Sequence, residues 1–111
     1  MNVNLAWLAL FAAGGCEVLW ASALPRTAGF TRLWPSLYCG FFIVLSLYLL
    51  ALATRVLPIS LAYAIWGGIG AAGVALYGFL ALGEWLGLAR GLCLAAIIGG
   101  VAGLKLLDAT T

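Results

Sequence analysis

Four long apolar segments, separated by short links, constrain the fold of this chain more than any other feature. They cover about residues 4–24, 33–53, 58–82 and 86–107. Each is close to the ~20 residues that an α-helix needs to cross ~30 Å of hydrocarbon. Only 7% of the residues are charged, whereas about a quarter are charged in a soluble domain. The sequence therefore predicts an all-α integral membrane protein, in which residues 1–111 form a single domain of four transmembrane helices.

The links and their charges predict how these helices insert. Links this short place successive helices side by side in an up-and-down bundle, with both termini on one side of the membrane. Lys and Arg residues in short loops set the orientation. One side carries Arg55 and Lys105, and the other carries Arg26, Arg32 and Arg90. Because the N-terminal amine offsets the difference of one residue, we expect dual topology, with two oppositely inserted copies pairing as an antiparallel dimer.

Small residues offer surfaces for that dimer. Gly99, Gly100 and Gly103 in the fourth segment form small-xxx-small spacings, which let helices approach closely. Gly70 and Gly73 share one face of the third segment and offer a second surface. The alternative is that these glycines pack helices within one subunit. For the fourth segment we favour the dimer contact.

Glu17 is the residue that points to a function. It lies deep in the first apolar segment, where an ionisable side chain is costly and marks a functional site by default. At helical spacing Gly14 and Trp20 share its face, and we expect Gly14 to line the pocket by leaving space beside the carboxylate. A proton or an organic cation can neutralise this carboxylate, and the two compete for it. That competition is the minimal condition for an antiporter, and a dimer brings two copies of Glu17 together.

Three further polar or aromatic residues are candidates for the same pocket. Ser46 is polar in mid-segment, and Tyr63 and Trp66 are three residues apart on the third segment. Aromatic faces suit a bound cation. The alternatives are that the aromatic residues anchor the helices at the membrane interface and that Ser46 donates to a carbonyl of its own helix.

Composition excludes other classes of function. The chain has no His, its three Cys residues lie in different apolar segments, and its net charge is +2. We therefore expect no metal and no cofactor, and neither a basic cluster for nucleic acid nor a nucleophile–base pair for an enzyme. The expected partners are membrane lipid, protons, a small organic cation and a second copy of the chain.

Several motifs together resemble the small multidrug resistance family of proton-coupled four-helix exporters, which work as antiparallel dimers. The matching stretches are Glu17-Val18, Gly29-Phe30-Thr31-Arg32, Leu57-Pro58, Ala62-Tyr63-Ala64-Ile65-Trp66 and Gly68-Ile69-Gly70. The resemblance implies a location in a bacterial inner membrane. It also implies that Glu17 binds substrate and protons in turn, while the other pocket residues line the site or orient the carboxylate (Trp20, Ser46, Tyr63 and Trp66).

Within that family the chain is similar to the guanidinium-exporter branch. Trp20 carries most of this similarity, because the polyaromatic-drug branch usually has a small residue there. Gly83-Glu84 and the stretch from Gly100 to Lys105 also fit the guanidinium branch. A guanidinium presents a planar fork of donors to a carboxylate and stacks on aromatic rings. We therefore expect a proton-coupled exporter of guanidinium or guanidinyl cations.

Three positions depart from the pattern of the branch: Pro25, Gly67 and Leu47 stand where a Lys, a Thr and an aromatic residue are usual. These departures leave room for larger guanidinyl substrates. The alternatives are a broad exporter of quaternary ammonium cations and a partner subunit of a heterodimeric exporter.

Overall fold

The computed structural model describes residues 2–85 and 87–110, and the helices in this part of the chain follow one another with short links. They are α1 (Val3–Ala23), the 3₁₀ helix η1 (Leu24–Thr27), α2 (Leu33–Ala53), α3 (Ile59–Ala81) and α4 (Gly87–Thr110). Four of them are long and apolar enough to cross a membrane. The expected all-helical fold with four candidate membrane spans is therefore confirmed.

The first α-helix ends at Ala23, two residues before Pro25. The Asn2 side chain accepts a hydrogen bond from the Leu5 N–H at 2.8 Å and caps the start of α1. At the other end the chain continues as η1, with Pro25 in its first turn. A proline is tolerated there because the N–H that it lacks would have no helical partner. The first membrane segment thus extends to Thr27.

Helix α2 coincides with its predicted range, and the other boundaries lie within three residues of the predicted ones. Pro58 is the N-cap of α3, so the helix begins at Ile59. The end of α3 is followed by Gly83 with a φ of +71°, the left-handed conformation that commonly terminates a helix. Leu86, the predicted start of the fourth segment, lies outside the described residues, and α4 is described from Gly87.

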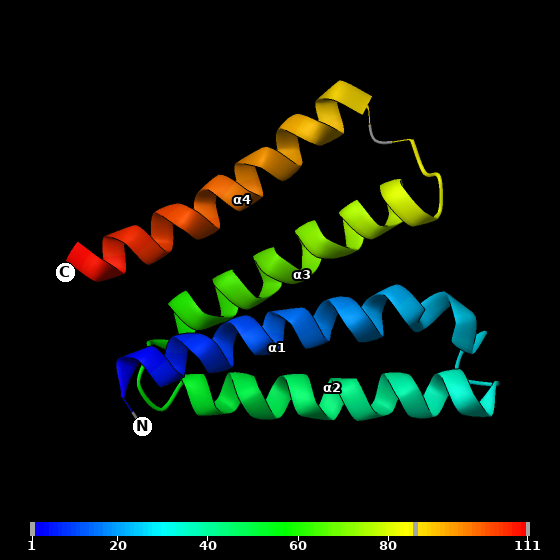
Figure 1. Ribbon diagram of the computed structural model, residues 1–111, viewed down its shortest axis with the longest axis horizontal. Coiled ribbons are helices and arrows are strands. Elements are labelled where there is room, and N and C mark those ends of the chain that lie inside the picture. The colour runs from blue at the N-terminus through cyan, green and yellow to red at the C-terminus, as the bar shows by residue number, and fades with distance from the viewer. Residues whose placement is uncertain (1, 86, 111) are drawn as a thin grey trace.

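Helix α1 lies between α2 and α3, and α4 lies beside α3 at the edge of the bundle (Figure 1). Both ends of the described chain lie at the same end of the bundle (Figure 1). The core sits where the first half of α1 meets the other two helices. Apart from Trp7, its members are small or aliphatic residues, among them Ala6, Leu10, Ala13, Leu50, Ala53, Ala62 and Ile65. Small side chains on α1 let both neighbouring helices approach it closely.

Helix α4 is held by few contacts. A Cβ at Gly68 of α3 would meet the side chain of Val101, so the helices touch at this point. The Nζ of Lys105 lies 4.7 Å from the centre of the Trp7 ring, a cation–π contact that joins α4 to the start of α1. Between residues 88 and 107, most other α4 side chains are exposed. This helix therefore presents a broad face outside the bundle.

Candidate functional site

Glu17 points from α1 toward α3, and its carboxylate lies directly against Gly70. A Cβ at position 70 would overlap the carboxylate carbon and both of its oxygens. The Oε2 atom is buried and has no hydrogen-bond partner among the described residues. Burying a carboxylate oxygen without a donor is costly. A bound proton or a cationic donor removes that cost, and this chemistry matches the competition expected at Glu17.

Ser46 of α2 connects three helices through its hydroxyl group. Its Oγ donates to the Ala13 carbonyl of α1 at 2.7 Å and accepts from the Trp66 Nε1–H of α3 at 2.9 Å. Ala13 is one turn before Glu17. The alternative that Ser46 donates to a carbonyl of its own helix is wrong, because the acceptor belongs to α1. Ser46 thus holds the Trp66 ring at a set position beside α1.

The aromatic residues of α3 form one unit. The rings of Tyr63 and Trp66 meet edge to face, with centroids 5.3 Å apart and an interplanar angle of 72°. Trp66 is partly buried, whereas Tyr63 is 59% exposed. Within one chain, then, Trp66 is part of the network around α1, and Tyr63 extends that aromatic surface outward.

Trp20 lies one turn beyond Glu17 on α1. Its indole Nε1–H is buried and has no hydrogen-bond partner among the described residues. Its backbone carbonyl accepts a hydrogen bond from the Cys39 thiol of α2, with 3.4 Å between sulfur and oxygen. Two successive turns of α1 therefore carry an unpaired acceptor at Glu17 and an unpaired donor at Trp20.

The glycines near the carboxylate pack helices within the chain. A Cβ at Gly14 would lie 2.8 Å from Ile69 Cγ2, so the Ile69 side chain fills the space that we expected beside the carboxylate. A Cβ at Gly73 would overlap the Val18 side chain. Gly70 and Gly73 are therefore α1–α3 contacts and not the dimer surface suggested from their spacing. The absence of side chains at these positions allows the close approach of the two helices.

Gly70 is the site residue that sequence reasoning missed. The Gly68-Ile69-Gly70 motif was a detectable signal, but nothing local to it identifies Glu17 as the neighbour.

The glycines of α4 differ from those of α3. Gly99, Gly100 and Gly103 lie on α4, and a Cβ at any of them would meet no described atom within 4 Å. These three residues are thus open to a contact from outside the chain.

A bundle of four membrane helices that holds an unpartnered carboxylate between α1 and α3, with a Ser46–Trp66 hydrogen bond joining α2 to α3, fits a small membrane transporter. Residues 5–98 match the family described as Small Multidrug Resistance protein. The chain belongs to this family of multi-pass transporters.

Curated relatives align with almost the whole chain. The guanidinium exporter of Citrobacter freundii is 47% identical over 102 residues, which are 92% of this chain and 97% of the relative. That of Salmonella typhimurium strain LT2 is 48% identical with the same coverage. The guanidinium exporter of Proteus vulgaris is 45% identical and covers 92% of this chain and 98% of its own length.

Proposed function

We propose that this protein exports guanidinium or guanidinyl cations in exchange for protons. The observation that carries the proposal is the Glu17 carboxylate between α1 and α3, with a buried oxygen that has no donor among the described residues. The similarity to proteins named guanidinium exporters supports the choice of substrate.

Glu17 binds either a proton or a cation but not both, because one of them is enough to neutralise its single negative charge. A guanidinium donates two parallel N–H bonds to a carboxylate and can stack its face on an indole or phenol ring. Trp20, Trp66 and Tyr63 supply such rings on α1 and α3, and Ser46 orients Trp66 through its 2.9 Å hydrogen bond. When a proton occupies the carboxylate, the charge that holds the cation is lost and the cation leaves. An inward proton gradient then drives cations outward.

The exporter works as an antiparallel dimer with dual topology in the bacterial inner membrane. The nearly equal distribution of Lys and Arg on the two sides supports insertion in both orientations. The open positions at Gly99, Gly100 and Gly103 support a contact between α4 helices of two copies. A second copy also supplies a second Glu17 and helps to enclose a hydrated cavity around the carboxylate, for which four helices alone are too few.

The departure at Gly67 supports a pocket with room for larger guanidinyl compounds. A Cβ at this position, next to Trp66, would meet no described atom within 4 Å. A substituent on the guanidinium can therefore extend along α3 past Trp66. The same space suits quaternary ammonium cations, and a broad exporter of these is the second candidate.

Transport by the purified chain in proteoliposomes tests the proposal. Electrogenic currents on addition of guanidinium, but not of tetraethylammonium, are expected. The opposite preference would favour the broad exporter, and silence with both would favour a partner subunit of a heterodimer. Glu17→Gln, which keeps the size of the side chain and removes its charge, should abolish both cation binding and proton release. Proton-coupled exchange by this variant would refute the mechanism.

A further inference from the structure

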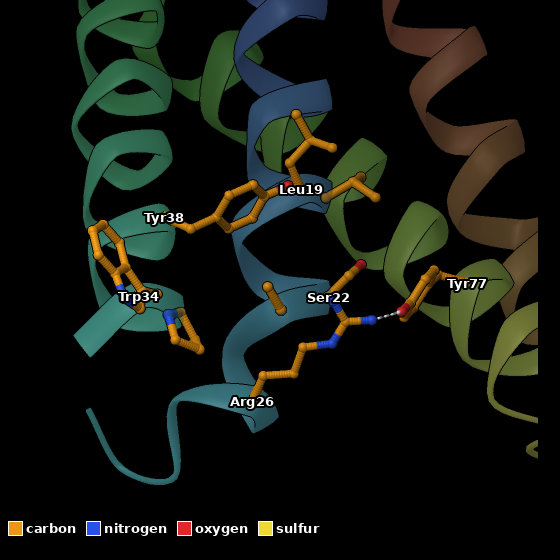
Figure 2. Close-up of a pocket in the computed structure, with 9 residues that line it drawn as sticks. Leu19, Ser22, Arg26, Trp34, Tyr38 and Tyr77 are labelled. Carbon is orange, nitrogen blue, oxygen red and sulfur yellow. Dashed lines mark hydrogen bonds between the residues drawn. The ribbon is translucent and has the colours of Figure 1, made fainter. Parts of the chain in front are cut away.

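A second pocket lies on the side of α1 that faces away from the Glu17 carboxylate. Its volume is about 530 Å³. Two of its lining residues, Leu19 and Ser22, follow Glu17 by two and five positions, which places them roughly 200° and roughly 140° around the helix from it at about 100° per residue. Figure 2 shows both side chains with Arg26, between Tyr38 of α2 and Tyr77 of α3. This pocket is thus separate from the transport site.

One end of the pocket is polar and lacks negative charge. The Arg26 Nη2 donates to the Tyr77 hydroxyl at 3.2 Å (Figure 2), and the remaining guanidinium donors have no described partner. The Ser22 Oγ is buried and has no hydrogen-bond partner among the described residues. None of the nine residues that line the pocket is acidic. A positive charge and unused hydroxyl and guanidinium donors together suit an anion with several acceptor oxygens.

The rest of the pocket is apolar. All six remaining lining side chains are aliphatic or aromatic: Val18, Leu19, Ala23, Trp34, Pro35 and Tyr38. A small inorganic anion would leave this surface without a partner. An anion that carries a hydrocarbon chain would cover it, because burial of apolar surface is favourable.

The position along the helices identifies the source of such an anion. Arg26 lies in η1, where the first membrane segment ends, and it is exposed. Trp34 at the start of α2 is 76% exposed, as is typical of aromatic residues at the level of the lipid headgroups. Basic pockets between transmembrane helices bind phosphate headgroups. The pocket therefore lies where phosphates of the bilayer are concentrated.

We propose that this pocket binds the phosphate of an anionic bilayer lipid. Arg26 and Ser22 donate to the phosphate oxygens, and one acyl chain lies over Leu19 and Tyr38. Because Arg26 also donates to Tyr77, the bound lipid links the end of the first membrane segment to α3. The proposal does not depend on which cation is transported.

Native mass spectrometry of the purified full chain, titrated with phosphatidylglycerol, tests this site. Phosphatidylcholine is the comparison lipid, and inorganic phosphate is the competitor. Arg26→Gln should lower the amount of bound phosphatidylglycerol about fivefold, the effect expected for one basic residue near a lipid phosphate. Arg32→Gln is the matched control, because Arg32 is exposed nearby but does not line the pocket. This control should bind phosphatidylglycerol as the unsubstituted chain does.

Ser22→Ala provides a second variant with a small change in volume. It should also reduce phosphatidylglycerol binding, and helix content by circular dichroism should stay unchanged. Equal losses in the Arg26 and Arg32 variants would overturn the proposal, because general surface charge would then explain the binding. Equal binding of phosphatidylcholine would refute the requirement for an anionic lipid. Displacement by inorganic phosphate would refute the role of the acyl chain.

Discussion

Replacing Gly70 with alanine tests whether the contact between α1 and α3 positions the Glu17 carboxylate. The new Cβ would overlap the carboxylate carbon and both oxygens. Because the carboxylate ends a flexible side chain, we expect it to move aside while the helices stay in place. The substitution should therefore impair function more than it impairs folding.

The size of the effect follows from the overlap. Non-bonded carbon atoms rest about 3.5–4.0 Å apart, so the carboxylate must shift by at least ~1 Å. A misplacement of ~1 Å in a site can cost up to about 100-fold in rate. We expect guanidinium-driven currents to fall by about 10- to 100-fold, equivalent to about 1.4–2.7 kcal/mol. The overlap also lowers the free energy of unfolding. This loss is partly offset, because alanine stabilises a helix by about 1 kcal/mol relative to glycine.

The assay is a comparison of Gly70→Ala with Gly67→Ala in proteoliposomes that contain equal amounts of protein. Gly67 is on the same helix, one turn earlier, and its added Cβ would meet no described atom within 4 Å. Gly67→Ala should keep most of the transport of small guanidinium. Wild-type currents in Gly70→Ala would show that the position of the Glu17 carboxylate does not depend on this contact.

Substitutions at three further positions probe the rest of the bundle. Ser46→Ala should lower the free energy of unfolding in detergent by about 1–3 kcal/mol, because the Trp66 N–H loses its acceptor; unchanged thermal unfolding would contradict this. Lys105→Met should cost about 0.5–1 kcal/mol by removing the cation over Trp7, and Lys105→Arg should restore the loss. Gly103→Leu should weaken the dimer in cross-linking while the helix content is retained, since the position is open within one chain; an unaffected dimer would place the interface elsewhere.

The spans and the key carboxylate could be predicted from the sequence because both depend on local properties. Hydrocarbon thickness sets the length of a spanning helix, so the apolar runs alone indicated four helices within a few residues. A carboxylate in such a run is costly wherever it faces, so Glu17 was identifiable without any knowledge of its neighbours. Pro25 was less predictable, since a proline can either end a helix or begin a 3₁₀ turn.

The neighbours of these residues required the tertiary structure. Helical periodicity shows which residues share a face, but not which helix that face meets. Ser46 could equally have bonded within its own helix, and only the packing of α2 against α1 gave it the Ala13 carbonyl. The same packing placed Gly70 against Glu17 and filled the space at Gly14 with Ile69. From the sequence alone came four membrane helices and one costly charge, because both follow from residue type and length. The close approach of α1 and α3 that shapes the site came from the rotation and pairing of helices, which depend on all of their contacts together.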